Sequence, residues 1–239
     1  MMTELLFRDD AYLTHCDAVV TAVDEVGVYL DRTVCYANGG GQPGDTGRIL
    51  RADGSELAIV NTVKGVDGQP AHVLAEGSAA PAVGDKLRIE IDWARRHLHM
   101  RYHTALHLLS AVIRAPVTGG QVAADKARLD FQIDMSLLDK DRIETELNAL
   151  IAAGSPVGSR WIADAELDAN PGMVKTMSVA PPRGQGQVRL IDIPGVDLQP
   201  CGGTHVRNTA EIGRVVVQKI RSEGKQNKRV IIAFADDGV

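Results

Sequence analysis

The sequence predicts an α+β protein of two domains, with a small β-barrel over residues 1–92 and an α+β domain with an antiparallel sheet over residues 93–239. Three observations predict this class. Short runs rich in Val and Ile, separated by Gly, Asp, Asn and Pro turns, fill residues 1–92, as is typical of a small barrel or sandwich. One long helical pattern follows, and the remainder alternates strand patterns with one further helix.

The first domain is predicted from four strand-like runs and the turns between them. The runs are AVVTAV at 18–23, GVYLDRT at 27–33, LAIVNTV at 57–63 and KLRIEID at 86–92. The segment EGSAAPAVGDK at 76–86 is predicted to be the loop that enters the last of these strands, because Gly, Pro and Asp favour turns.

A helix is predicted to begin after Asp92, its N-cap, and to end before Pro116. Apolar residues recur at steps of three and four and form one stripe: Leu98, Tyr102, Ala105, Leu106, Leu109 and Ile113. Pro116 and the pair Gly119-Gly120 are predicted to close the helix. Trp93 is predicted to mark the helix entry rather than a base-stacking platform.

The rest of the second domain is predicted to form an antiparallel sheet covered by helices. Residues 127–133 alternate apolar and polar side chains, which indicates a half-buried strand, and residues 137–154 follow a helical pattern. Further strands are predicted at 188–193, 211–222 and 228–235, the last two joined by a polar turn at 223–227.

Composition and charge restrict the class of protein. Hydrophobic residues make up 44% and charged residues 24%, as in soluble globular chains. No apolar run approaches the roughly 20 residues of a membrane span, and the first residues hold no signal-peptide stretch. Three cysteines indicate a reducing compartment, so we expect a cytoplasmic protein with no membrane partner. The net charge of −5 excludes a sequence-blind DNA-coating protein, and no DNA partner is expected.

Two sequence motifs predict a metal site. His103 and His107 lie four residues apart on the predicted helix, a spacing that places both imidazoles on one face. Downstream, CGGTH at 201–205 offers a thiolate and a third imidazole, and its glycines allow the backbone to bend so that both face one point. Because Cys and His together suit zinc, the candidates for holding one Zn2+ are His103, His107, Cys201 and His205.

Spacing alone leaves alternatives open at this site. His99 lies four residues before His103, so His99 and His103 form a rival pair on the same helix. An isolated histidine pair of this kind is often structural, and Cys201 followed by His205 is modest evidence when taken alone.

Larger blocks of sequence carry a family resemblance. HTALHLL at 103–109 and CGGTHV at 201–206 resemble the paired zinc motifs of the alanyl-tRNA synthetase editing domain and of its free-standing relatives, the alanyl-tRNA editing (AlaX) proteins. Three longer blocks are similar to that family in the same order: DRTVCYANGGGQPGDTG at 31–47, DKARLDF at 125–131 and CGGTHVRNTAEIG at 201–213. The resemblance favours His103 over His99 as the first ligand.

The resemblance implies a zinc-dependent aminoacyl-tRNA deacylase that acts in trans, with residues 93–239 as the editing domain. The expected substrate is mischarged tRNA(Ala), first Ser-tRNA(Ala) and then Gly-tRNA(Ala), attacked by a zinc-activated water. The chain is too short to hold a synthetase core beside these blocks, so no use of ATP is expected. One departure lies at 35–38, where Cys-Tyr-Ala-Asn replaces the aromatic pair and acid common in the family, which leaves Asn38 as the candidate for the role of the acid.

Candidates for substrate contact adjoin the ligands in the sequence. A pocket that hydrogen-bonds a seryl hydroxyl would reject alanyl-tRNA, because its buried polar group would be left unpaired. The candidates are Gln121, Thr118, Thr204, Gly202 and Gly203, each of which is also an ordinary turn or strand residue. Four ligands fill a tetrahedral site, so catalysis needs a fifth position or a displaced ligand, with His205 or Cys201 considered first. A covalent nucleophile is the rival role for Cys201.

Two segments are candidates for contact with the tRNA acceptor end. The glycine-rich loop exposes backbone N–H groups that can approach a phosphate or ribose: Gly39, Gly40, Gly41 and Gln42. The last predicted hairpin supplies cations: Arg214, Lys219, Arg221, Lys225, Lys228 and Arg229. Residues 93–239 carry a net charge of +3 and residues 1–92 carry −8, which fits a nucleic-acid face on one half or chance variation between domains. Alternatively, the glycine-rich loop is a tight turn that packs the first domain on the second, and the cations of the hairpin lie on a solvated face of the sheet.

Two other functions stay open on the sequence. A non-catalytic tRNA-binding module with a structural zinc would have four ligands and no open coordination position. A zinc hydrolase of a small ester or amide would not need the basic hairpin.

Overall fold

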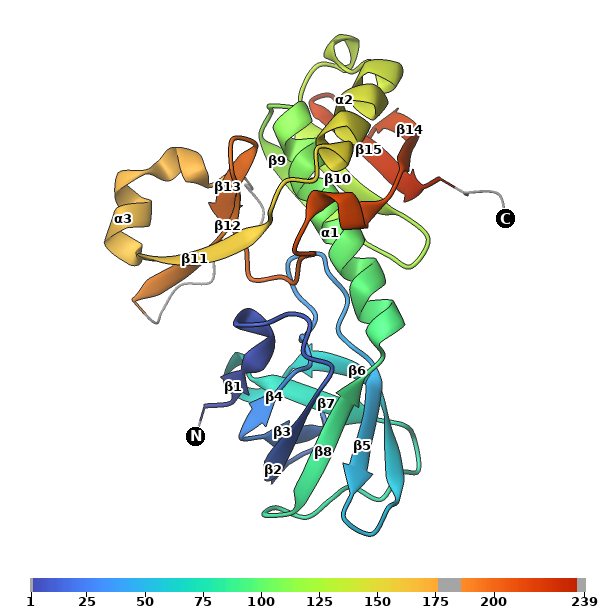
Figure 1. Ribbon diagram of the computed structural model, residues 1–239, viewed down its shortest axis with the longest axis vertical. Helices are drawn as coiled ribbons and strands as arrows, with labels where there is room; N and C mark the ends of the chain where they lie inside the picture. The colour runs from blue at the N-terminus through green and yellow to red at the C-terminus, as the bar shows by residue number, and fades with distance from the viewer. Residues whose placement is uncertain (1, 176–185, 236–239) are drawn as a thin grey trace. The chain divides into compact units, whose positions relative to one another are not determined.

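A computed structural model describes residues 2–175 and 186–235 of the protein. The chain divides into two compact units, Met1–Leu98 and His99–Val239, and the division falls within the long helix α1 (Trp93–Val112) (Figure 1). None of the described helices is both long enough and apolar enough to cross a membrane.

The first unit contains a closed barrel of six strands in the order β2-β3-β7-β6-β5-β8. The strands are β2 (His15–Val23), β3 (Val28–Leu30), β5 (Gly47–Arg51), β6 (Glu56–Lys64), β7 (Pro70–Leu74) and β8 (Lys86–Ile91). Every second residue points inward, so that Ala18, Val20, Ile49, Leu87 and Ile89 form part of one apolar core. The prediction of a barrel is confirmed.

Shorter elements complete this unit. They are β1 (Glu4–Leu5), which pairs in parallel with β4 (Arg32–Thr33), and the 3-10 turns Leu6–Arg8 and Val66–Gly68. Strands β5 and β7 are absent from the sequence prediction, because each begins with a residue typical of turns. Gly47 allows β5 to lie close to β8, since a Cβ atom at this position would be 2.1 Å from the carbonyl oxygen of Glu90.

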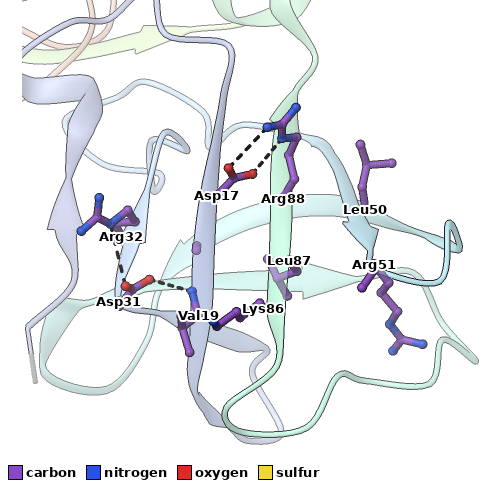
Figure 2. Close-up of a pocket in the computed structure, with 11 residues that line it drawn as sticks. Asp17, Val19, Asp31, Arg32, Leu50, Arg51, Lys86, Leu87 and Arg88 are labelled. Carbon is purple, nitrogen blue, oxygen red and sulfur yellow. Dashed lines mark hydrogen bonds and ion pairs between the residues drawn. The ribbon is translucent and has the colours of Figure 1, made fainter.

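The outer surface of the barrel carries exposed ion pairs beside a groove across β2, β8 and β5 (Figure 2). Asp17 and Arg88 face each other on β2 and β8, with 2.8 Å between Oδ1 and Nε. Nearby, the Asp31 carboxylate accepts a hydrogen bond from the Val19 backbone N–H at 2.8 Å. These polar side chains lie on the outer surface of the barrel and are not part of its apolar core.

The second unit contains a four-stranded antiparallel sheet with α1 and α2 (Lys140–Ala152). Its order is β14 (Val215–Ser222), β15 (Asn227–Phe234), β10 (Ala127–Gln132) and β9 (Val117–Val122). Tyr102 of α1 stacks on Phe234 of β15 with 4.0 Å between ring centroids, and Asn148 of α2 accepts a hydrogen bond from the N–H of Val215 in β14. The prediction of an antiparallel sheet in this chain is confirmed.

A second, three-stranded antiparallel sheet belongs to the same unit. Its order is β11 (Gly158–Ala163), β12 (Gln187–Ile193) and β13 (Asp197–Pro200). Helix α3 (Asp164–Ala169) covers one face, where Leu167 packs with Ile162, Val188 and Leu190. Among the residues described between β10 and β12, the remaining elements are the 3-10 turns Met135–Leu137 and Pro171–Met173.

Three details of the second unit differ from the sequence prediction. Helix α1 is buried on more than one stripe, since Met100 and Leu108 are as inaccessible as Leu109. The glycines at 119–120 lie inside β9, where a Cβ on Gly120 would lie 2.9 Å from Leu129 Cδ2. The single strand predicted at 211–222 begins instead with the 3-10 turn Thr209–Ile212, which a capping box at its start favours.

Candidate metal centre

Helix α1 positions the first two histidines of the site. The helix begins at Trp93, directly after Asp92, whose carboxylate accepts a hydrogen bond from the N–H of Arg95 at 3.1 Å. His103 and His107 are one turn apart, with 5.4 Å between their ring centroids. His107 is buried and His103 is half-buried, so the pair lies at the edge of the helix surface that faces the protein interior.

Strand β13 and the loop after it position the other two residues. Alternation along β13 places Asp197 and Gln199 on one face of the three-stranded sheet, and Cys201 continues this alternation one residue beyond the strand. The Cys201 N–H donates to the Arg189 carbonyl oxygen at 3.1 Å. Arg189 Nη1 in turn donates to the carbonyl oxygens of Cys201 and Gly203, at 3.2 and 2.9 Å, which folds the loop back toward the sheet.

The four side chains converge on one point. His103, His107, Cys201 and His205 each offer a donor atom, and these atoms lie within 4.8 Å of one another. Cys201 Sγ lies 3.5 Å from His103 Nε2 and 3.3 Å from His205 Nε2. The group could hold one metal ion, and among the residues that the structure describes His99 is not a member of it.

Neighbouring groups bind the outer nitrogens of two of these imidazoles. His107 Nδ1 lies 2.8 Å from Asp197 Oδ2, and His205 Nδ1 lies 3.2 Å from Thr104 Oγ1. A partner on Nδ1 fixes the ring orientation and leaves Nε2 for a metal. Lys175 and Gln199 also bind the Asp197 carboxylate, at 2.5 and 2.7 Å, so the group that orients His107 is itself held.

The pKa values of the group suit metal binding at neutral pH. Burial would raise the pKa of Cys201, but His103 and His205 outweigh it and hold this pKa well below its usual range. Burial and His103 lower the pKa of His205 to about 3. A thiolate and a neutral imidazole, the two forms that bind metals, are therefore present without a change of pH.

His107 and Asp197 form a charged pair in the absence of a metal. Burial alone would lower the pKa of His107, but the hydrogen bond to Asp197 and the Cys201 thiolate raise it to about 9. The pKa of Asp197 is about 2 because its bonds to His107 and Lys175 outweigh the opposing effect of burial. A metal bound at Nε2 of His107 would displace one proton from this ring and leave its Nδ1–H bond to Asp197 in place.

Several residues of this site were not predicted from the sequence. They are Thr104, Lys175, Arg189, Asp197 and Gln199. A signal for two of them exists, because the period of two in Asp197, Gln199 and Cys201 is that of a strand with one face toward the site. The others depend on pairings between distant segments, which one sequence does not reveal.

The predicted substrate residues lie in two different places. Gly202, Gly203 and Thr204 adjoin the ligands, with the Gly203 N–H 3.4 Å from Cys201 Sγ and Thr204 fully buried. Thr118 and Gln121 lie on β9 and bond within the four-stranded sheet. Thr118 donates to Asn227 Oδ1 at 2.6 Å, and Gln121 Oε1 accepts from Arg128 at 3.2 Å.

The glycine-rich loop of the first unit forms a tight turn. Gly39 and Gln42 exchange two backbone hydrogen bonds of 3.1 and 3.0 Å around Gly40 and Gly41. Their φ values of 57° and 82° are those of a type I′ turn, which glycine adopts without strain. The Gln42 side chain is 2% exposed, so the turn presents backbone rather than this amide to solvent.

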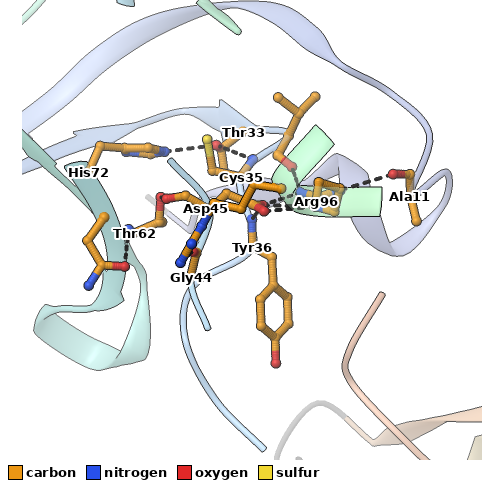
Figure 3. A network of polar contacts seen from close by, with 12 residues as sticks. Ala11, Thr33, Cys35, Tyr36, Gly44, Asp45, Thr62, His72 and Arg96 are labelled. Atoms are coloured by element: carbon orange, nitrogen blue, oxygen red, sulfur yellow. Dashed lines mark hydrogen bonds and ion pairs between the residues drawn. The ribbon is translucent and has the colours of Figure 1, made fainter. Parts of the chain in front are cut away.

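A buried ion pair fixes the base of this loop (Figure 3). The Asp45 carboxylate binds the Arg96 guanidinium and accepts a hydrogen bond from the Tyr36 N–H at 2.6 Å. In the segment 35–38, which differs from the pattern common in the family, Asn38 is exposed and Cys35 is fully buried. Burial raises the pKa of the Cys35 thiol to about 12, so it is not a nucleophile at neutral pH.

The basic residues of the last hairpin fall into two sets. Four are exposed: Arg214, Lys219, Arg221 and Lys225. Lys228 is buried and donates to the carbonyl oxygens of Gly224 and Lys225. Arg229 Nε lies 2.7 Å from Asp130 Oδ1, so these two cations are engaged within the fold.

Two family models match the chain. Residues 188–231 match the family described as the threonyl and alanyl tRNA synthetase second additional domain, and residues 9–95 match the one described as tRNA synthetases class II (A). The first match includes Cys201 and His205, and the second covers most of the barrel.

The chain is also similar to curated relatives over nearly its full length. A protein named alanyl-tRNA editing protein AlaX-M from Methanosarcina acetivorans is 36% identical over 98% of this chain and 100% of its own length. One of the same name from Saccharolobus solfataricus is 32% identical over 96% and 98%. AlaX-L from Pyrococcus horikoshii is 31% identical over 96% of this chain and 57% of its own length. The chain therefore belongs to the family of alanyl-tRNA editing proteins.

Proposed function

We propose that this protein deacylates mischarged tRNA(Ala) in trans, with Ser-tRNA(Ala) as its main substrate and Gly-tRNA(Ala) as a second one. The observation that carries the proposal is the convergence of His103, His107, Cys201 and His205 in a chain of the alanyl-tRNA editing family. The proposal places the protein in the cytoplasm, where it meets charged tRNA, and assigns it no use of ATP.

We infer that the metal is one Zn2+ per chain. One thiolate and three imidazoles suit this ion, and the Nδ1 partners Asp197 and Thr104 are of the kind that orient histidine ligands. When bound, zinc supplies Lewis-acid polarisation of the ester carbonyl and activation of a water for attack. Arg189 keeps the loop carbonyls of Cys201 and Gly203 turned toward itself, which directs the thiolate to the histidines.

Discrimination between seryl and alanyl esters needs a group that binds the seryl hydroxyl. We assign this group to the segment Gly202–Thr204, because it lies between two ligands and the Gly203 N–H is 3.4 Å from Cys201 Sγ. Thr118 and Gln121 are weaker candidates, since both bond to other strands of the four-stranded sheet. A site that leaves a buried polar group unpaired discriminates strongly against a substrate without the hydroxyl.

We propose that residues 93–239 form the deacylase domain and that residues 1–92 form a separate barrel domain that presents the glycine turn. Two surfaces are then candidates for the tRNA backbone. One is the turn of Gly39, Gly40 and Gly41, in which Gly40 is exposed, and the other is the set of exposed cations Arg214, Lys219, Arg221 and Lys225. Lys228 and Arg229 remain weaker candidates, because Lys228 donates to the hairpin turn and Arg229 is paired with Asp130 of β10.

Deacylation of a matched set of charged tRNAs tests the proposal. The zinc-loaded protein is expected to hydrolyse Ser-tRNA(Ala) and Gly-tRNA(Ala) and to spare Ala-tRNA(Ala). Equal rates on the seryl and alanyl substrates would refute the specificity.

The metal requires its own test. His103→Ala should abolish hydrolysis and lower the zinc content measured by atomic absorption. His97→Ala is the matched control, because His97 lies on the same helix outside the metal group and stacks on Trp93. Full activity of His103→Ala in the presence of a chelator would exclude a metal mechanism at this site.

One observation favours a second candidate function. Four protein ligands can fill a tetrahedral zinc site, as in structural zinc centres, so the chain could be a non-catalytic tRNA-binding module. That module would bind tRNA(Ala) with a strong dependence on salt and would hydrolyse none of the three esters.

A further inference from the structure

The three-stranded sheet of the second unit has two unlike faces. On one face, Ile162 of β11 and Val188 of β12 lie opposite each other and pack under Leu167 of α3. The other face carries Asp197 and Gln199 of β13, which contact the metal centre through His107. The sheet therefore separates an ordinary apolar core from the candidate active site.

A tryptophan lies on the metal-facing side of this sheet. Trp161 of β11 is opposite Arg189 of β12, and Cys201 is bonded to the other side of Arg189 through its N–H. Residues directly opposite in an antiparallel sheet share one face. Trp161, Arg189 and Cys201 thus form one row across three adjacent backbone segments.

The register sets the spacing along this row. Neighbouring strands are about 4.8 Å apart, so the backbone of Trp161 lies about 10 Å from that of Cys201. This is about the span of one nucleoside with an ester on its ribose. A substrate with its ester carbonyl at the four ligands can therefore reach Trp161 with its terminal base.

Exposure changes along the same face. Arg189 and Gln199 are each 7% exposed and Ile191 is 1% exposed, whereas Trp161 is 42% exposed at the edge strand β11 (Figure 1). Large aromatic side chains gain from burial, and the exposed part of the Trp161 side chain offers a ligand apolar surface beside the candidate active site. A nucleobase offers the flat surface that such a group stacks on.

We propose that Trp161 is the stacking platform for the terminal nucleobase of the tRNA substrate. The inference deepens the proposed deacylase function and rests on it. Stacking holds the base on the side of Arg189 away from Cys201. The ribose ester attached to that base then extends past Arg189 toward Cys201 and the histidines. Trp161 is a binding residue that takes no part in bond breaking.

Kinetics separate this role from a structural one. Base stacking on an aromatic side chain contributes an amount that corresponds to about a 5- to 150-fold change in binding. We expect Trp161→Ala to raise KM for Ser-tRNA(Ala) by that factor with little change in kcat, and Trp161→Phe to recover most of the loss. On the methyl ester of serine, which has no base, Trp161→Ala should equal the wild type. An equal loss on both esters, or none on the tRNA, would overturn the inference.

Fluorescence provides a readout that does not depend on hydrolysis. The chain has two tryptophans, so Trp93→Phe leaves Trp161 as the only indole. An uncharged acceptor minihelix that ends in adenosine should quench its emission, and one that lacks this last nucleoside should not. If the two minihelices quench Trp161 equally, or if neither does, the proposal that Trp161 stacks on the terminal base is refuted. If the quenching is selective but no ester is hydrolysed, the deacylase proposal fails and base recognition stands.

Discussion

Removal of one charge from the buried ion pair at the base of the glycine-rich loop tests how the first unit is held together. The Arg96 side chain is 0% exposed and that of Asp45 is 1% exposed (Figure 3). Arg96 Nε lies 3.0 Å from both carboxylate oxygens, and its terminal nitrogens also reach the carbonyls of Ala11 and Val34. Asp45→Asn keeps the side-chain shape but leaves the cation buried without its counter-charge. Breaking a buried pair from one side costs about 3–5 kcal/mol, so we expect the free energy of unfolding to fall by that amount.

Asp17→Asn is the matched control on the outer surface of the same barrel. Asp17 and Arg88 are also an ion pair, but their side chains are 76% and 46% exposed, so solvent screens the pair and the loss should be much smaller than in Asp45→Asn (Figure 2). Urea unfolding is followed by Trp93 emission in a Trp161→Phe background, because Trp93 packs on Tyr12 within the first unit. Equal losses in the two variants would refute the claim that burial sets the cost.

Two further predictions concern the same barrel. Gly44→Ala should lower the free energy of unfolding by at least about 2 kcal/mol, because its Cβ would lie 2.0 Å from the Thr62 carbonyl oxygen. Gly39→Ala should be much milder, because its Cβ would lie 3.2 Å from the flexible end of Lys64 and 3.7 Å from the Tyr36 hydroxyl, and a similar loss in both variants would count against the clash. Burial lowers the pKa of His72 from 6.5 to about 4, so the unfolded chain binds a proton that the folded barrel excludes. The free energy of unfolding should therefore fall by up to about 3 kcal/mol as the pH drops through that window, and parallel pH curves for wild type and His72→Asn would contradict this.

The sequence predicted those elements whose apolar pattern reflects burial alone. Helix α1 and strand β10 follow their expected periods, and the strand predicted at 228–235 corresponds to β15. Strand β9 was missed because its sequence, VTGGQV, resembles a turn, although Gly120 serves close contact with Leu129. Strand β13 was missed because DLQP is polar, and its polar side chains are turned toward His107. Local rules failed at β13 because its polar side chains serve the site, whereas β12, which carries Arg189, kept an apolar pattern and was predicted.

Only part of the metal centre was predictable, because local spacing does not distinguish rival ligands or reveal contacts between distant segments. Helical geometry explains why His103 and His107 share a face, but His99 satisfies the same spacing. The choice between them came from the resemblance of longer blocks, and the structure groups His103, His107, Cys201 and His205 without His99. The partner of His107 depends on the pairing of β13 with β12, which brings Asp197 to the helix from 90 residues away.

Charge and residue type alone did not separate binding surfaces from structural contacts. Lys228 and Arg229 belong to the same basic hairpin as Lys219, but their donors bind the turn and Asp130. The two tryptophans differ in their place in the fold. Trp93 opens α1 and packs on neighbouring rings, whereas strand register places Trp161 in a row with Cys201. A surface residue becomes a candidate for substrate binding when the register links it to reacting groups, because only then can one ligand touch both.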